Sequence, residues 1–119
     1  MKYLLLIYNA ETNWTSRSEA ERGKIFDEYM AYTNRIHRSG NYIAGEALQP
    51  IATATTVRTR DGKTVTTDGP FAETREQLGG FYMVEAKDLD EAIELAKGIP
   101  AVRQGCIEVR PIMPTPAPD

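Results

Sequence analysis

Apolar positions follow two different periods along this chain of 119 residues, and these periods predict its elements. Residues 3–8 (YLLLIY) are continuously apolar, which is typical of a strand in the middle of a sheet. After a polar stretch, apolar residues recur at helical spacing, at Ile25, Tyr29, Tyr32 and Ile36. This spacing puts them on one side of a helix, which we expect over residues 18–39.

Polar residues mark the expected ends of this helix. Ser18 with Glu21 has the spacing of a capping box, and Ser16 with Glu19 offers the same box two residues earlier. Gly40 is expected to end the helix, because glycine readily adopts the left-handed conformation found there.

A second strand region and a hairpin follow. The strand begins at residues 42–44, is broken by Gly45 and Pro50, and resumes over residues 53–60. Residues 61–62 (DG) then predict a two-residue turn into a strand at 63–67, because Asp-Gly accepts the positive φ angles of a type I′ turn. The hairpin is polar and rich in threonine, so we expect it at an edge of the sheet.

A third strand leads to a second helix. Residues 80–86 form an apolar run, and Asp88 with Glu91 has the spacing of a helix cap. Gly98 and Pro100 end this helix. Its expected buried side chains are Leu89, Ala92, Ile93 and Ala96.

The chain closes with a strand and a tail. Residues 105–111 alternate, with Ile107 and Val109 on the inward side. Residues 113–119 hold three prolines and have no periodicity, so we expect an extended or disordered tail. The sequence therefore predicts a single domain over residues 1–112.

The order of these elements is that of a ferredoxin-like α+β domain, βαββαβ, with an inserted β-hairpin. Two helices on one face of its antiparallel sheet would leave the other face bare. Alternate residues of the first strand, such as Tyr3, Leu5 and Ile7 or their neighbours, would be apolar and exposed there. A patch of this size is not usually left in water, so we predict a homodimer in which two sheets pack face to face.

The amino-acid composition limits the kinds of partner that the protein is expected to bind. The net charge is −3, with 17 acidic and 14 scattered basic residues, which argues against direct nucleic-acid binding. The apolar start is too short for a secretion signal or a membrane span, and no basic amphipathic helix favours a membrane surface. The lone cysteine, Cys106, excludes an intrachain disulfide and fits a reducing cytoplasm. We expect a small molecule or another protein as the partner.

The most unusual stretch is Asp68-Gly69-Pro70-Phe71. The carboxylate of Asp68 either caps the turn by accepting backbone N–H bonds or acts as a general acid or base. Gly69 supplies a φ value that other residues avoid, and Pro70 fixes the chain that follows. Phe71 is expected in the core or as the wall of a pocket.

Other polar and aromatic residues are candidates for shaping a site. Tyr29 lies on the buried stripe, as core or as a hydrogen-bond donor in a pocket. His37 lies one position off that stripe, near the end of the helix. Arg58 is solvated, pairs with Asp68, or binds an anionic substrate. Tyr82, on the third strand, is a further candidate for shaping a pocket.

No metal or cofactor is expected. One histidine, one cysteine and no tight carboxylate cluster give no recognisable ligand set. Gly79 and Gly80 do not form a phosphate-binding loop, and we expect them to let the third strand pack closely. Cys106 is expected to be a buried, unreactive thiol.

The segment TVRTRDGKTVTTDGPFAETREQLGGFYMVEAKDLDEAIELAKGIP, followed by GCIEVRPIMP, resembles the YCII-related family, and within it the branch called the DGPF domain after residues 68–71. The match runs from KYLLLIY near the start to EVRPI near the end. The resemblance implies a dimeric α+β barrel, in which two ferredoxin-like sheets pair, in agreement with the homodimer predicted above. Members of the family are largely uncharacterised.

The resemblance also implies a site. A His-Asp pair is proposed in the wider family, and Asp68 is similar in position to its aspartate. The matching histidine position falls near Tyr29, while the only histidine, His37, lies two helical turns later. A few relatives are small-molecule lyases such as dehydrochlorinases, and many members are encoded near extracytoplasmic-function sigma factors.

Two hypotheses for the function follow. The first is a lyase-like or isomerase-like enzyme, in which Asp68 moves a proton on a cyclic or acidic metabolite in a pocket between the first helix and the hairpin. The alternative is a non-catalytic ligand-binding or regulatory module associated with extracytoplasmic-function sigma factors.

Overall fold

Two antiparallel sheets of different size organise residues 1–118, the part of the chain that the computed structural model describes. The larger sheet has the strand order β2-β5-β1-β6, and the smaller one pairs β3 with β4. The strands are β1 (Lys2–Asn9), β2 (Tyr42–Ala47), β3 (Thr55–Arg60), β4 (Lys63–Asp68), β5 (Gln77–Glu85) and β6 (Cys106–Pro111). The helices are α1 (Glu11–Thr15), α2 (Glu19–Arg38) and α3 (Leu89–Lys97), with 3-10 turns η1 (Ile51–Thr53) and η2 (Pro100–Arg103).

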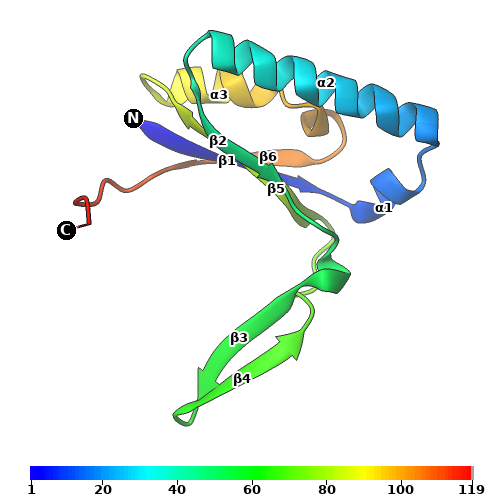
Figure 1. Ribbon diagram of the computed structural model, residues 1–119, viewed down its shortest axis with the longest axis vertical. Helices are drawn as coiled ribbons and strands as arrows, with labels where there is room; N and C mark the ends of the chain where they lie inside the picture. Colours follow the sequence, from blue (N-terminus) through cyan, green and yellow to red (C-terminus); the bar gives the residue numbers. More distant parts are fainter. Residues whose placement is uncertain (119) are drawn as a thin grey trace.

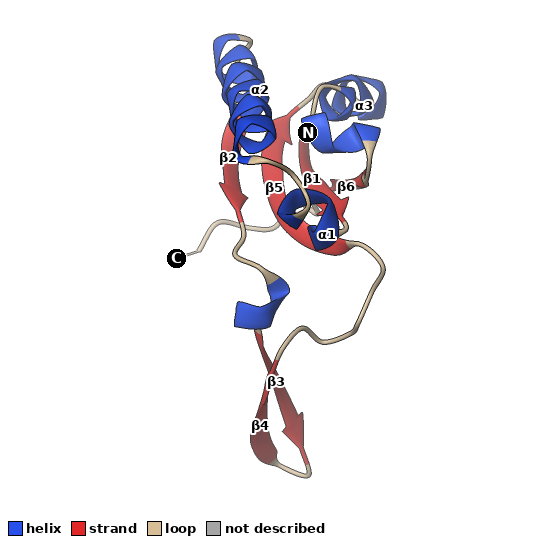
Figure 2. Ribbon diagram, turned by 90° about the vertical axis from the view of Figure 1, so that its right-hand side faces the viewer, coloured by secondary structure: helices blue, strands red, loops and turns tan. Residues whose placement is uncertain are grey.

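Helices α2 and α3 lie together on one side of the larger sheet (Figures 1 and 2). Helix α2 connects β1 to β2, and α3 connects β5 to β6, so each edge strand is reached through a helix. The predicted ferredoxin-like α+β fold, with an inserted hairpin, is therefore confirmed.

The predicted first helix is confirmed by its end contacts. The Ser18 hydroxyl accepts a bond from the Glu21 N–H at 3.2 Å, and the Glu21 carboxylate accepts one from the Ser18 N–H at 3.1 Å. This is the later of the two predicted capping boxes. At the other end Gly40 has a φ of 81°, the left-handed conformation predicted for the stop.

The core lies between the helices and the larger sheet. Tyr3, Leu5 and Ile7 of β1 are buried there, so they face the helices and not the bare side of the sheet. Because side chains alternate along a strand, their neighbours Leu4 and Leu6 point to the opposite, open face. The residues on the open face are therefore the neighbours Leu4 and Leu6, and not Tyr3, Leu5 and Ile7.

Two positions in the sheet are occupied by glycine because a side chain there would meet a neighbouring strand. A Cβ on Gly80 would lie 2.8 Å from the Glu46 carbonyl oxygen, which confirms the predicted close packing at Gly80, whereas a Cβ on Gly79 would meet no atom within 4 Å. Strand β2 continues through Gly45 to Ala47, and β3 begins only at Thr55, so the predicted interruption is confirmed at Pro50 and wrong at Gly45. A Cβ on Gly45 would lie 2.8 Å from the Tyr82 ring, so this glycine makes room for the ring within the sheet.

Helix α3 is capped as predicted but buries fewer residues. The Asp88 carboxylate accepts a bond from the Glu91 N–H at 2.9 Å. The two alanines of the predicted stripe are buried, whereas Leu89 and Ile93 are exposed, which corrects the prediction. The small alanine side chains let this short helix approach the sheet closely. The larger side chains of Leu89 and Ile93 lie outside this contact between helix and sheet.

Helix α1 was not predicted, because its five residues are too few to show an apolar period. Glu11 at its start connects it to two other segments. The Glu11 N–H donates to the Gln77 side-chain oxygen at 2.9 Å, and the Glu11 carboxylate accepts from the Ile51 N–H at 2.8 Å. These bonds fix η1, from which the hairpin extends.

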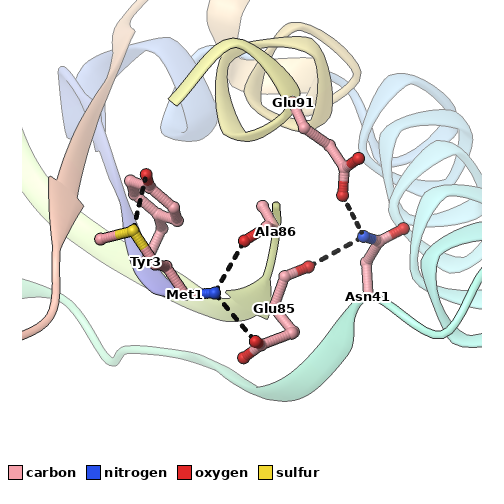
Figure 3. A network of polar contacts seen from close by, with 6 residues as sticks. All are labelled: Met1, Tyr3, Asn41, Glu85, Ala86 and Glu91. Atoms are coloured by element: carbon pink, nitrogen blue, oxygen red, sulfur yellow. Dashed lines mark hydrogen bonds and ion pairs between the residues drawn. The ribbon is translucent and has the colours of Figure 1, made fainter. Parts of the chain in front are cut away.

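A polar network joins the first residue to the end of α2 (Figure 3). The Met1 amino group donates to the Glu85 carboxylate and to the Ala86 carbonyl, each at 2.9 Å. The Asn41 side-chain amide donates to the Glu85 carbonyl at 2.8 Å and to the Glu91 carboxylate at 3.1 Å. The network thereby ties α2, β5 and α3 together at the end of the sheet opposite the hairpin.

Residues 112–118 form no helix or strand. The Ile112 N–H donates to the Lys2 carbonyl at 2.9 Å, which holds the start of this segment against β1. Of the tail predicted over residues 113–119, Asp119 lies outside the described residues. Among residues 1–118, each helix is too short or too polar to cross a membrane.

Candidate functional site

Residues 55–68 form an arm, made of β3, a turn and β4. The turn is the predicted Asp-Gly turn, with φ angles of 51° at Asp61 and 76° at Gly62. The arm leaves the larger sheet on the side away from the helices (Figures 1 and 2). It is a sheet of its own and not an edge of the larger one, which corrects the predicted position.

The turn after β4 is held by two hydrogen bonds, one to Ala54 just before β3 and one to the Thr56 side chain within β3. Gly69 has a φ of 103°, so the prediction that it supplies an unusual φ is confirmed. Its N–H donates to the Ala54 carbonyl at 2.7 Å, and its carbonyl accepts from the Thr56 hydroxyl at 2.8 Å. These two bonds fix the backbone on the C-terminal side of Asp68.

Asp68 is exposed at the end of β4, opposite Thr55. Its carboxylate makes no hydrogen bond or ion pair within residues 1–118, so the predicted capping bonds to the turn are absent there. Strand alternation puts Asp68 and Arg58 on opposite faces of the arm. The Arg58 guanidinium donates instead to the Phe71 carbonyl at 3.4 Å.

The face of the arm that carries Arg58 forms an open groove of about 350 Å³. We call this the arm groove. It is lined by Thr56, Arg58, Arg60, Val65, Thr67, Pro70 and Phe71.

Phe71 is 77% exposed, so it is a wall of the arm groove and not a core residue. Arg58 and Arg60 have no carboxylate partner within residues 1–118. A groove lined by two arginines and an apolar ring suits a planar anion, because guanidinium pairs with carboxylate or phosphate while the ring covers an apolar body.

The other candidate residues belong to the layer between α2 and the sheet. The Tyr82 hydroxyl shares a hydrogen bond of 2.7 Å with the Thr33 hydroxyl. Burial, with a further contribution from nearby Tyr82, raises the pKa of Tyr29 to about 12. Burial also raises the pKa of Tyr82. Both phenols therefore keep their protons at neutral pH and act there as hydrogen-bond donors, not as bases.

His37 is exposed in the last turn of α2 and stacks on Tyr42, with 3.8 Å between the ring centres. Helix α2 and the arm lie at opposite ends of the molecule (Figure 1). One chain therefore groups Asp68, Arg58 and the Gly-Pro-Phe turn on the arm, and keeps Tyr29, Tyr82 and His37 away from them. The pocket predicted between the first helix and the hairpin is not formed within one chain.

Cys106 is exposed, not buried as predicted. Its thiol donates to the Glu76 carboxylate at 3.7 Å. Desolvation and the nearby Glu76 carboxylate raise the pKa of the thiol, which disfavours the nucleophilic thiolate. Within residues 1–118, no group of three potential metal-ligating side chains comes together.

Sequence reasoning missed Arg60 and Val65 as neighbours of Arg58 in the groove. The predicted hairpin already contained the information that places these two residues next to Arg58. Residues two apart on a strand share a face, and the Asp-Gly turn sets Val65 opposite Arg58.

Comparison with known proteins agrees with this fold. The model of the YCII-related domain matches residues 1–116. An uncharacterised protein of Rhizobium meliloti (strain 1021) is 35% identical over 114 residues, covering 94% of this chain and 92% of that protein. With its ferredoxin-like α+β fold, the chain belongs to the YCII-related family. Its assignment to the DGPF branch stays a prediction.

Proposed function

We propose that the protein works as a homodimer that binds a small anionic molecule in the arm groove. The observation that carries this proposal is that two arginines, Arg58 and Arg60, line the same groove as the exposed side chain of Phe71. Ligand binding is the non-catalytic alternative left open by the sequence, and the position of Asp68 on the far side of the arm favours it. The single free thiol supports a cytoplasmic location as part of the proposal.

The open face of the larger sheet supports the homodimer. Leu4 and Leu6 of β1 pair with Met83 and Phe81 of β5, so four apolar side chains adjoin in the middle of this face. Helices α2 and α3 cover the other face (Figure 2). Apolar surface of this kind is typical of a contact between proteins, and two identical sheets related by a twofold axis cover each other.

The ligand class follows from the chemistry of the groove. A guanidinium group offers paired N–H donors that match the two oxygens of a carboxylate or the oxygens of a phosphate. Phe71 and Val65 offer apolar contact to the rest of the molecule. An aromatic carboxylate or phosphate monoester therefore uses both parts of the groove.

Benzoate and phenyl phosphate are suitable probes. At ten times the dissociation constant, either is expected to raise the melting temperature by about 3–6 °C, because binding only to the folded state stabilises it. The double variant R58Q/R60Q is expected to lose this shift. Differential scanning fluorimetry measures the shift in melting temperature for the wild type and for the double variant.

The matched control is K24Q/R38Q, which removes two positive charges from α2, outside the arm. It is expected to keep the full shift. Equal shifts in the two double variants, or no shift of the wild type with either probe, contradict the proposed anion site.

Catalysis by Asp68 is a second candidate function, supported by the fixed backbone beside an exposed carboxylate. In this reaction the carboxylate takes a proton from a carbon next to a carbonyl group and later returns one from solvent. The association with sigma factors, which rests on the family resemblance, stays a prediction.

Phenylpyruvate in D₂O tests this reaction, since it is an aromatic anion with acidic C–H bonds. Proton NMR is expected to show catalysed deuterium exchange, reduced about 100-fold or more in D68N. The melting temperature of D68N is expected to change by less than about 2 °C, because the side chain is exposed. Exchange at the buffer rate with wild-type protein, or equal rates for both proteins, contradicts this role.

A further inference from the structure

We propose that each arm crosses to the second chain of the homodimer and packs against its body, so that the arm groove is closed by both chains. This inference rests on the proposed pairing of the open sheet faces and names what completes the ligand site. Four observations about the arm carry it.

The first observation is that the arm has no core of its own. All its residues are exposed except Thr56, which is half-buried. A two-stranded hairpin alone is at best marginally stable in water, because it buries too little surface to offset the ordering of its backbone. The order of the arm therefore calls for a surface on which it packs.

The second observation is its direction. Both ribbon views show the arm leaving the larger sheet on the side of the open face, away from α2 and α3 (Figures 1 and 2). This is the side on which the second sheet of the proposed homodimer lies. The arm therefore points toward the second chain.

The third observation is its length. The six residues of β3 extend for about 20 Å at the rise of a strand, while stacked sheets lie about 10 Å apart. The arm is thus long enough to pass the interface and reach the side of the partner. The radius of gyration is 16.5 Å. About 13–14 Å is expected for a compact chain of this size, and both the arm and the tail extend away from the body (Figure 1).

The fourth observation is charge. The groove face of the arm carries Arg58, Arg60 and Lys63, whereas Asp68 lies on its other face. The whole chain has a net charge of −3, so the body that remains without the arm is acidic. Glu46 stands opposite Phe81 at the β2 side of the open face. The arm as a whole holds three basic residues and two acidic ones, Asp61 and Asp68, so its positive charge is concentrated on the groove face, and that face against an acidic body is a complementary contact.

The consequence is a site built from two chains. In one chain the arm groove has one wall, formed by the arm and the turn with Phe71. A body packed against this wall encloses the ligand, excludes water and strengthens the contact between guanidinium and anion. The body of the second chain then supplies the opposite wall that a single chain lacks.

Cross-linking of a mixed dimer tests this placement. Chains with natural and with ¹⁵N-labelled nitrogen are mixed, equilibrated and treated with an amine-reactive cross-linker. Mass spectrometry then separates links within a chain from links between chains. Lys63 at the arm tip is expected to link between chains to lysines of the body, namely Lys2, Lys24, Lys87 or Lys97.

A shortened arm gives an independent measurement. In this variant, Asn-Gly replaces residues 57–66, so that a type I′ turn joins Thr56 to Thr67 directly and Gly69 keeps its bonds. Its dimer dissociation constant, from sedimentation equilibrium, is expected to rise about tenfold or more.

The outcomes separate the two proposals. A wild-type protein that is monomeric throughout overturns the pairing of sheets and the crossing arm together. A wild-type dimer in which Lys63 links only within its own chain, or in which the shortened arm leaves the dissociation constant unchanged, overturns the crossing arm and leaves the pairing intact.

Discussion

Replacing Leu6 by glutamate is expected to turn the proposed homodimer into folded monomers. Leu6 lies in the middle of the open face, paired with Phe81 on one side and Glu108 on the other. In a face-to-face dimer both chains would bring a new carboxylate next to Phe81 and beside the existing carboxylate of Glu108, which repels it. An unpaired charge buried in this way costs several kcal/mol, so the dissociation constant is expected to rise about 1,000-fold or more.

Sedimentation velocity measures this change, and far-UV circular dichroism checks that L6E keeps its fold. The matched control is F26E on α2, because Phe26 is also apolar and 62% exposed but lies away from the open face. F26E is expected to remain dimeric. A dimeric L6E, or dissociation of both variants to the same degree, contradicts the proposed interface.

Replacing Tyr32 by alanine is expected to lower the free energy of unfolding by about 3–5 kcal/mol. The side chain is 2% exposed between α2 and the sheet. Its ring packs edge-on against Tyr82, with 5.2 Å between the ring centres, and its hydroxyl donates to the Leu95 carbonyl at 2.7 Å. Alanine removes these contacts and leaves a cavity. Urea titration of the dimer at fixed protein concentration gives the value.

The variant Y32F separates the ring from the hydroxyl group. Phenylalanine keeps the packing and leaves the Leu95 carbonyl without its partner, at an expected cost of about 1–2 kcal/mol. Equal losses for Y32A and Y32F would mean that the ring contributes nothing, contrary to its position in the core.

The ferredoxin-like body could be predicted because local patterns and tertiary packing agree there. The capping box at Ser18, the stop at Gly40 and the cap at Asp88 each depend on residues close in sequence. The central strand showed its burial as a continuous apolar run. Which of its two faces meets the helices could not be predicted, because both Leu5 and Leu6 are equally apolar.

The position of the arm could not be predicted from local patterns. The Asp-Gly turn fixes the pairing of β3 with β4, but the direction of the hairpin depends on the contacts of Glu11 and Ile51 at its base. These residues are far apart in sequence. The predicted pocket between the first helix and the hairpin was wrong within one chain for this reason.

The candidate site was predicted in part. Pro70 and Phe71 line the same groove as Arg58, whereas Asp68 lies on the other face of the arm, so the suggested Arg58–Asp68 pair is not formed within one chain. The exposure of Phe71 was not predicted, since an aromatic residue beside a turn is typical of a core. In the proposed dimer this ring is covered by the second chain, which accounts for an apolar residue at such a position.

The mass of the wild-type protein in solution tests the central claim most directly. Sedimentation equilibrium at micromolar concentration is expected to give twice the chain mass of 13.3 kDa, because two open sheet faces cover each other. A mass of 13.3 kDa at every protein concentration from the micromolar range up to about 100 times higher would contradict the homodimer. It would also contradict a ligand site closed by two chains.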